Sequence, residues 1–259
     1  MSTEAQLPTT EIRVLLLENI HESATETFHT YAEGRTYAIT RKSSALKEDD
    51  LIAALDGIQL LGIRSKTRVT KRVVENASSL LALGCFCIGT NQVDLTGANA
   101  CGIPVFNAPF SNTRSVAELM IGEIITLARQ LGDRSNEVHK GAWKKVAAGC
   151  YEVRGKTLGI IGYGHIGRQL GVLAEALGMR VLYFDIAPRL PMGNNRSVTT
   201  LNAVLEQSDF ISLHVPETPE TKNMIGQAQL AKMKKGSYLL NASRGTVVVI
   251  PELAAALKS

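Results

Sequence analysis

The sequence contains no long uninterrupted apolar run. Hydrophobic residues make up 45% of its 259 positions, yet none of their runs approaches the roughly 18 residues that a membrane-spanning helix needs. The opening segment, MSTEAQLPTTE, is polar and lacks the apolar centre of a secretory signal. We therefore expect a cytoplasmic protein without a membrane partner.

Clusters of basic charge are also missing. The 28 Lys and Arg residues outnumber the 24 Asp and Glu residues only slightly, and they are spread along the chain. Aromatic residues account for only 5% of the sequence. Because a nucleic-acid surface needs clustered basic residues, often with aromatic residues among them, we expect no nucleic-acid partner.

Cysteine is sparse, with thiols only at Cys85, Cys87, Cys101 and Cys150. The first two are separated by one residue and lack both a second pair and the usual spacing of zinc ligands. Buried structural thiols in a reducing cytoplasm are favoured over a redox role. We therefore predict no metal site.

Apolar runs typical of strands alternate with runs of helical spacing throughout the chain. In the first hundred or so residues this alternation extends from an apolar run at 13–17 to another at 103–106. Repeated strand–helix units predict a parallel sheet with helices on both faces. We predict two doubly wound α/β domains: a flavodoxin-like, substrate-binding domain over residues 1–110 and a Rossmann domain over 111–259, incomplete at its carboxyl end.

The most specific motif is the glycine turn Gly162-x-Gly164-x-x-Gly167. An apolar run precedes it, and a helical run that ends at Gly178 follows it. The first glycine permits a tight turn, the second lets the backbone approach a pyrophosphate, and the third allows close helix packing. The positive end of the helix then favours the phosphates. An ordinary glycine-rich turn is the weaker alternative.

Asp185 closes the next apolar run, 18 residues after Gly167. An acid in this place accepts hydrogen bonds from a ribose hydroxyl and would repel a 2′-phosphate. Strand, glycine turn, helix, strand and acid together predict a site for NAD rather than NADP.

Three strand ends of the first domain carry candidate ligand-binding residues. The first reads Arg64-Ser65-Lys66-Thr67-Arg68, the second is the glycine-rich stretch 84–89, and the third is 107–114. Ligands of open parallel sheets lie beyond the carboxyl ends of the strands. Arginine binds carboxylate or phosphate bidentately, so the first segment suits an anionic ligand, although a solvated basic loop is an equally weighted alternative.

In the second domain, Arg244 and His214 follow predicted strands. Arg244 could clamp a substrate carboxylate and polarise its carbonyl group, or it could form a structural ion pair; we favour the clamp. His214 could donate a proton, but lining the cofactor is favoured. The only tryptophan, Trp143, lies in the polar segment 133–145 and is either an interface anchor or a core residue.

A start signal for a long helix is also present, because Ser115-Val-Ala-Glu118 has the pattern of a capping box. We place the crossover between the two domains just before it, near residues 108–112.

Several motifs resemble those of a known family. GIIGYGHIG, SLHVPETPETKNMI and LLNASRGTVV look like the signatures of the D-isomer-specific 2-hydroxyacid dehydrogenases. LGIRSKT, GCFCIGTNQVDL and GIPVFNAPFSNTRSVAEL narrow the resemblance to the phosphoglycerate dehydrogenases of that family. The resemblance covers residues 12–259. It implies NAD-dependent oxidation of 3-phospho-D-glycerate to 3-phosphohydroxypyruvate, the first step of L-serine biosynthesis, in a homodimer or homotetramer.

The resemblance also implies roles for individual residues. Arg244 matches the catalytic arginine of the family, and Trp143 matches a region of its dimer interface. Lys66 stands where an arginine is common, which keeps the charge but loses the bidentate fork. The substrate-binding positions are Arg64, Ser65, Lys66 and Asn112. The cofactor-binding positions, which include the glycines of the turn, are Gly162, Gly164, His165, Ile166, Gly167, Asp185, His214, Val215, Ala242, Ser243 and Arg244.

Two departures from the family pattern are visible. The catalytic glutamate and histidine of the family lie downstream of the Arg244 motif, beyond residue 259, so we expect an amino-terminal fragment. Val249 also occupies a position where the family usually has an aspartate, and this removes a candidate cap of the following helix, worth about 1 kcal/mol.

Two other functions remain open from the sequence. One is a non-catalytic NAD(H)-sensing interaction module of the same fold. The other is a dehydrogenase for a different 2-hydroxy acid, such as glycerate, lactate or 2-hydroxyglutarate. The loop Arg64-Ser65-Lys66, which a sensor would not need, favours the enzyme over the first alternative. Preference for a phosphorylated acid over its unphosphorylated analogue would separate a phosphoglycerate dehydrogenase from the second.

Overall fold

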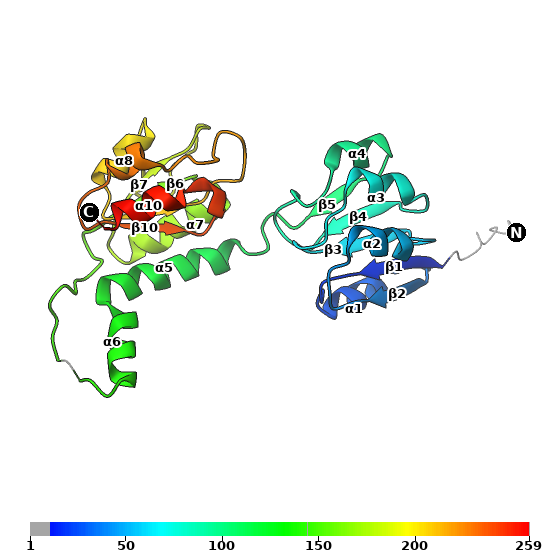
Figure 1. Cartoon of the computed structure of the whole chain (residues 1–259), viewed down its shortest axis with the longest axis horizontal. Helices are drawn as coiled ribbons and strands as arrows, with labels where there is room; N and C mark the ends of the chain where they lie inside the picture. The colour runs from blue at the N-terminus through cyan, green and yellow to red at the C-terminus, as the bar shows by residue number, and fades with distance from the viewer. Residues whose placement is uncertain (1–10, 144, 259) are drawn as a thin grey trace, which may run out of the picture. The chain divides into compact units, whose positions relative to one another are not determined.

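The computed structural model describes residues 11–143 and 145–258. The chain forms two compact units that divide between Ser111 and Asn112. We call the amino-terminal part unit 1 and the carboxyl-terminal part unit 2. Each unit has its own parallel sheet (Figure 1). Hydrophobic cores lie on both faces of each sheet.

Unit 1 alternates strands and helices without interruption. In chain order its elements are β1 (Ile12–Leu16), α1 (Ser23–Thr30), β2 (Tyr37–Arg41), α2 (Glu48–Ala54), β3 (Leu60–Ile63), α3 (Lys71–Asn76), β4 (Ala82–Cys85), α4 (Leu95–Ala100) and β5 (Val105–Asn107). The strands are parallel and lie in the order β2-β1-β3-β4-β5. This is the flavodoxin-like order, as predicted, and its direction reverses between β1 and β3.

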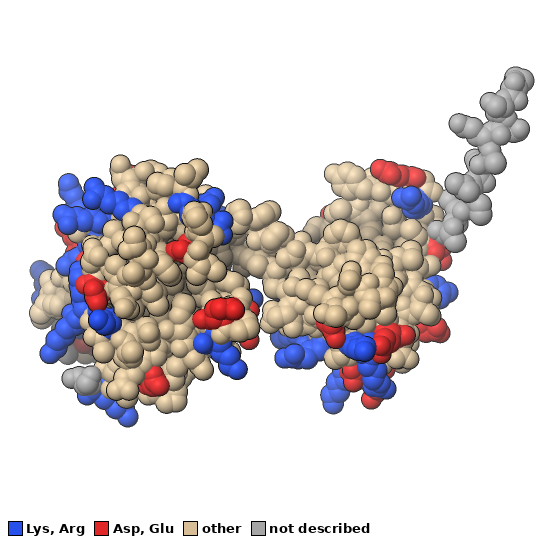
Figure 2. Space-filling view, turned by 90° about the horizontal axis from the view of Figure 1, so that it is seen from above, with Lys and Arg blue, Asp and Glu red and all other residues tan. Residues whose placement is uncertain are grey.

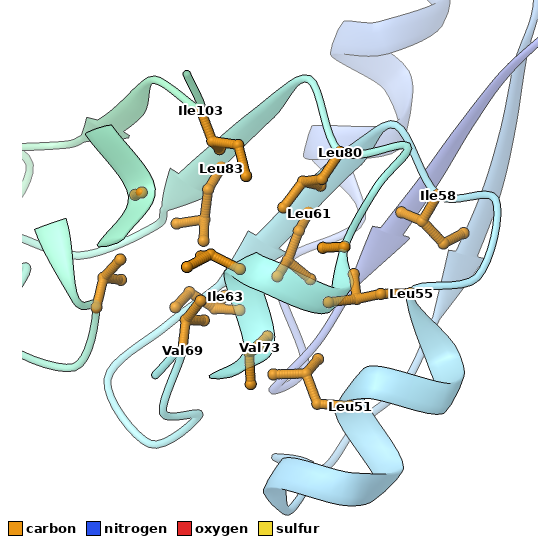
Figure 3. Close-up of a cluster of buried hydrophobic side chains, with 14 of the residues drawn as sticks. Leu51, Leu55, Ile58, Leu61, Ile63, Val69, Val73, Leu80, Leu83 and Ile103 are labelled. Atoms are coloured by element: carbon orange, nitrogen blue, oxygen red, sulfur yellow. The ribbon is translucent and has the colours of Figure 1, made fainter. Parts of the chain in front are cut away.

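Alternation along β1 explains how this sheet is covered on both faces. Leu15 and Leu17 enter one core with residues of α2, α3 and α4, while Val14 and Leu16 enter a second core beside α1. Successive side chains of a strand point to opposite faces. Figure 3 shows the first core, where apolar side chains from β3, β4, α2 and α3 converge.

Unit 2 begins with two helices and continues as a second strand–helix series. Its elements are α5 (Thr113–Arg129), α6 (Leu131–His139), β6 (Thr157–Ile161), α7 (His165–Ala176), β7 (Arg180–Phe184), β8 (Arg196–Ser197), α8 (Leu201–Gln207), β9 (Phe210–Leu213), α9 (Gln227–Leu230), β10 (Tyr238–Asn241), a 3₁₀ turn (Gly245–Val247) and α10 (Ile250–Ala256). The parallel sheet has the order β10-β9-β6-β7-β8. This is the Rossmann arrangement of the predicted domain, with its reversal between β6 and β9.

Two cores sandwich the sheet of unit 2. Apolar residues of α5 and α7, among them Ile124 and Leu170, pack on one face. Val204 and Leu205 of α8 pack on the other. A doubly wound sheet is thereby confirmed for this unit as well.

One local prediction was wrong. Helix α5 begins at Thr113 with Asn112 as its cap residue, so Ser115 lies inside the helix and no capping box forms there. Glu118 instead accepts a hydrogen bond from Arg114 at 2.5 Å, an i,i+4 pair on the helix surface.

Charges of both signs are interspersed over the faces of the two units that Figure 2 displays. Within residues 11–143 and 145–258, no helix is both long enough and apolar enough to cross a membrane.

Candidate functional site

The glycine turn of unit 2 joins β6 to α7 at the point where the sheet order reverses. Gly162 has φ +92°, and a Cβ atom there would lie 2.5 Å from the carbonyl oxygen of His214. A Cβ on Gly167 would lie 2.4 Å from the oxygen of Gly162. Both positions therefore exclude any side chain, because the backbones of β6, α7 and the β9 end meet here.

Gly164 differs from these two glycines. It is the cap residue of α7 with φ −78°, and a Cβ atom there would meet no heavy atom within 4 Å. The protein itself thus does not require glycine at this position. Open space beside the amino end of a twelve-residue helix fits a bound pyrophosphate.

Asp185 holds the glycine turn from the end of β7. Its carboxylate accepts hydrogen bonds from the amides of Tyr163 at 2.8 Å and Ala187 at 2.9 Å. Arg189 lies 3.5 Å from the same group, whose side chain is only 10% exposed. A carboxylate has about four acceptor sites, so capacity for a ribose hydroxyl remains after these bonds.

Tyr163 is a residue that sequence reasoning missed. It occupies a variable position of the glycine motif, yet it is fully buried and stacks on Tyr183 with ring centroids 3.6 Å apart. Its hydroxyl group accepts a hydrogen bond from Asn195 Nδ2 at 2.6 Å. The motif gives no signal for this role, because a variable position carries no information about burial.

His214 follows β9 and lies against the glycine turn through its backbone. Its Nε2 is 2.8 Å from the Ser212 hydroxyl, and its buried Nδ1 has no hydrogen-bond partner among the described residues. Burial lowers the pKa of His214 to about 4. The imidazole is therefore neutral near pH 7 and a poor proton donor, which agrees better with a lining role than with acid catalysis.

Arg244 sits in a tight polar turn after β10. Asn241 Oδ1 accepts hydrogen bonds from the Ser243 amide at 3.0 Å and the Ser243 hydroxyl at 2.7 Å, and Asn241 Nδ2 donates to the Arg244 carbonyl at 2.9 Å. The half-buried guanidinium donates to the Ser243 carbonyl at 3.0 Å and pairs with no carboxylate among the described residues. Ala242 packs on the core. A structural ion pair within the described residues therefore does not explain Arg244.

The candidate anion loop of unit 1 follows β3. The side chains of Arg64, Ser65 and Lys66 are all exposed. Beneath them, the carboxylate of Glu18 accepts hydrogen bonds from the amides of Arg64 at 3.2 Å, Lys66 at 2.9 Å and Thr67 at 2.8 Å. Glu18 is only 7% exposed, and nothing in the linear sequence links it to this loop 46 or more residues away.

The pKa of Glu18 reflects two opposing effects. Burial by itself would raise it, but the hydrogen bonds from Thr67, Lys66 and Arg64 outweigh burial and bring it below its ordinary value. The group is therefore ionised at neutral pH.

Asn112 was also predicted to contact substrate. It is the cap residue of α5, its side chain is exposed, and it makes no capping hydrogen bond. His165 and Ile166 are the first residues of α7, and Val215 packs near Gly162, so these cofactor candidates gather around the glycine turn.

A pocket of about 830 Å³ opens at the opposite edge of the unit 2 sheet. It lies where β6 and β7 begin, at Thr157 and Arg180, away from the glycine turn. Its lining carries both signs of charge, with Arg180, Arg196 and Lys234 as well as Glu175 and Glu206. It is separate from the glycine turn, which lies at the carboxyl end of β6.

In the described part of the chain, no three or more His, Cys, Asp or Glu side chains are placed to hold a metal ion. All four cysteines are free thiols, but Cys101 is exposed, so the expectation of buried thiols is wrong there. Burial raises the pKa of Cys85 to about 11, with smaller contributions from Cys87 and Glu18.

Comparison with known proteins identifies the family. Residues 121–259 match the D-isomer specific 2-hydroxyacid dehydrogenase, NAD binding domain. This match covers more than half of the chain. The chain belongs to the D-isomer specific 2-hydroxyacid dehydrogenase family. Unit 2 contains the matched residues and is the NAD-binding domain of this dehydrogenase family, so NAD is its cofactor.

Relatives of known name are similar over nearly the whole chain. A D-3-phosphoglycerate dehydrogenase of Dictyostelium discoideum is 56% identical over 259 residues, which cover 100% of this chain and 63% of the relative. D-3-phosphoglycerate dehydrogenase 2 of Saccharomyces cerevisiae is 57% identical over 97% of this chain and 53% of its own length. The chain thus spans only about half to three-fifths of these curated relatives.

A solved structure of a similar protein supports the fold. D-lactate dehydrogenase from Aquifex aeolicus, complexed with NAD and lactic acid, matches with a TM-score of 0.80 at 28% identity. The match covers 95% of this chain and 73% of that one.

Proposed function

We propose that the chain is part of an NAD-dependent dehydrogenase that oxidises 3-phospho-D-glycerate to 3-phosphohydroxypyruvate, the first step of L-serine biosynthesis. The observation that carries this proposal is the basic loop Arg64-Ser65-Lys66 at the switch point of unit 1. It accompanies identities of 56% and 57% to relatives named phosphoglycerate dehydrogenases. A phosphorylated acid carries more negative charge than its unphosphorylated analogue, so two cations in one exposed loop favour the phosphorylated acid.

In this proposal the cofactor occupies the carboxyl edge of the unit 2 sheet. The amino end of α7 at Gly164 and His165 takes the pyrophosphate, and Asp185 accepts a ribose hydroxyl. His214, Val215 and the turn at 242–244 line the remainder. When bound, NAD supplies the acceptor for the hydride that leaves the substrate carbon.

Arg244 is the proposed carboxylate clamp. A guanidinium offers two parallel donors to a carboxylate and stabilises negative charge that develops on the neighbouring oxygen. Its freedom from ion pairs with described carboxylates supports this role. Arg64 and Lys66, with Ser65 and Asn112, are proposed to bind the phosphorylated end of the substrate.

Calorimetric titration tests the substrate proposal directly. The chain, saturated with NAD⁺, is titrated with 3-phospho-D-glycerate and with D-glycerate. We expect the phosphorylated acid to bind at least about 100-fold more tightly, because cations built for a phosphate lose their partner with the analogue.

Matched variants sharpen this titration. Arg64→Gln and Lys66→Gln should each weaken binding of the phosphorylated acid and leave the affinity for glycerate unchanged. Lys71→Gln, at an exposed lysine on α3, removes the same charge and should change neither. Equal affinities for the two acids would favour another 2-hydroxy acid, and binding of NAD without either acid would favour a non-catalytic NAD(H) sensor.

A homodimer or homotetramer in the cytoplasm completes the proposal. Helix α6 buries none of its residues, and Figure 1 shows it and the following loop extending away from the sheet of unit 2. Exposed apolar side chains lie on α6 and shortly after it, at Leu131, Val138, Trp143 and Val146. We call this part of unit 2 the arm. A second copy of the chain would cover them. Free thiols at all four cysteines suit a reducing compartment.

A further inference from the structure

Glu18 is a buried acid at the switch point of unit 1 that the function described above leaves without a role. We propose that Glu18 is a positioning residue, which holds the loop 64–67 in the conformation that presents Arg64 and Lys66 to the phosphorylated substrate. This inference rests on the proposed function, because that function assigns the phosphorylated acid to this loop.

The hydrogen-bond geometry gives the loop a defined inner and outer side. The carboxylate of Glu18 takes the amides of Arg64, Lys66 and Thr67, at distances of 2.8 to 3.2 Å. The amide of Ser65, between the first two, donates to no acceptor in the described part of the chain. Three amides therefore point inward to the carboxylate, and the one remaining amide is left for a ligand together with the exposed side chains.

Gln92 holds the same loop through its carbonyl side. Its side chain is only 8% exposed, and Nε2 donates to the Arg64 carbonyl at 2.8 Å and to the Gly89 carbonyl at 3.1 Å. The backbone of Gln92 also accepts a hydrogen bond from the Val69 amide at 2.9 Å. Glu18 thus holds the amide of Arg64, and Gln92, in the segment after β4, holds its carbonyl group.

Charge gives Glu18 a second role in the loop. Arg64, Lys66 and Arg68 are three exposed cations within five residues, and they repel one another before an anion arrives. The ionised carboxylate lies directly beneath them and forms no ion pair within the described residues. It is balanced by backbone amides instead, so the cationic side chains stay available.

The backbone at this point is held in an unfavourable conformation. Glu18 and Asn19 have φ values of +60° and +54°. Residues other than glycine adopt this left-handed backbone conformation only at a cost in free energy. Such conformations persist where the surrounding contacts determine them, and they cluster at ligand sites. Here they turn the Glu18 side chain from the end of β1 into the adjoining end of β3.

Two variants of the full chain test this role. Glu18→Gln keeps the size but places an amide group against amide donors, whereas Glu18→Asp keeps the charge. We expect Glu18→Gln to raise the dissociation constant for 3-phospho-D-glycerate at least about tenfold, because charged hydrogen bonds are lost. Glu18→Asp should recover part of the affinity. The affinity for NAD should not change in either variant.

Hydrogen exchange of the loop amides supplies a readout that is independent of substrate. The amides of Lys66 and Thr67 should exchange at least about tenfold faster in Glu18→Gln than in the wild-type chain. Glu26→Gln, at an exposed acid on α1, is the control that should change neither exchange nor binding. If Glu18→Gln does not fold, Gln92→Met removes the opposite contact and should produce the same two effects.

The outcomes separate the two proposals. Wild-type affinity and wild-type exchange in the Glu18→Gln and Gln92→Met variants would overturn the positioning role alone. Failure of the wild-type chain to bind 3-phospho-D-glycerate would overturn the proposed function and, with it, the role of Glu18 toward this ligand. Faster exchange with unchanged substrate affinity would reduce Glu18 to a structural residue and contradict the inference.

Discussion

The three glycines of the glycine turn differ in what surrounds them. Gly162 and Gly167 face backbone of the protein itself, whereas Gly164 faces open space. The motif predicted different roles for the three glycines, and their surroundings agree: the fold itself excludes a side chain at Gly162 and Gly167 and leaves Gly164 open for the proposed pyrophosphate. The roles of Glu18 and Asn241, in contrast, depend on contacts that no spacing in the sequence indicates.

Val249 gives a prediction at the residue scale. It is the cap residue of α10 and makes no side-chain capping bond. Val249→Asp should raise the free energy of unfolding by about 1 kcal/mol, since a carboxylate at this position accepts a hydrogen bond from the amide of Glu252, the third residue of the helix, and its negative charge suits the helix amino end. Urea unfolding measures the change, with Val249→Ala as the control that should give no gain. Equal free energies of unfolding for Val249→Asp and Val249→Ala would contradict the interpretation that α10 lacks a stabilising cap.

His214 predicts a pH dependence of stability. Its pKa in the folded chain is about 4, below the ordinary value of 6.5, because of burial. The unfolded chain therefore binds more protons between pH 4 and 6.5, so His214 makes stability rise with pH in this window and adds no dependence above it. In His214→Gln, the free energy of unfolding should depend less on pH between these values. His29→Gln, at an exposed histidine, should leave that dependence unchanged. An unchanged slope in His214→Gln would contradict a buried neutral imidazole.

At the scale of elements, periodicity predicted the strands well, and it failed where burial does not dictate the pattern. The apolar runs expected at 13–17 and 103–106 correspond to strands β1 and β5 of unit 1. Helix α6 was missed because its sequence is polar and it buries no residue. Strand β8 was missed because two residues, Arg196 and Ser197, carry no alternation.

Close packing between β6 and α8 yields a prediction at this scale. A Cβ atom on Gly159 would lie 2.2 Å from Ser208 Oγ and 2.4 Å from Val204 Cγ1. Gly159→Ala should lower the free energy of unfolding by about 1–3 kcal/mol, because the core side chains must move apart. Gly122→Ala is the matched control. Nothing lies within 4 Å of a Cβ there, inside α5, so this change should stabilise by about 0.5–1 kcal/mol. Equal effects of the two substitutions in urea unfolding would contradict this packing.

For the whole molecule, the sequence predicted the fold class and the family, and the structure adds an exposed arm. Trp143 is 81% exposed, a large apolar surface that association would bury. Trp143→Ala should weaken self-association about 30-fold or more, as expected of a central aromatic anchor. Sedimentation equilibrium measures this, with Leu190→Ala, at a side chain 84% exposed elsewhere in unit 2, as a control. A monomeric wild-type chain, or equal association of both variants, would contradict the interface.

The most direct test of the account as a whole is the titration of NADH into the wild-type chain and the Gly164→Ala variant, with urea unfolding of both. If the pyrophosphate lies against Gly164 at the amino end of α7, the variant should bind NADH at least about tenfold more weakly. Its free energy of unfolding should not fall, because the protein leaves that position open. Unchanged affinity for NADH in a stably folded variant would contradict the placement of the dinucleotide at this turn.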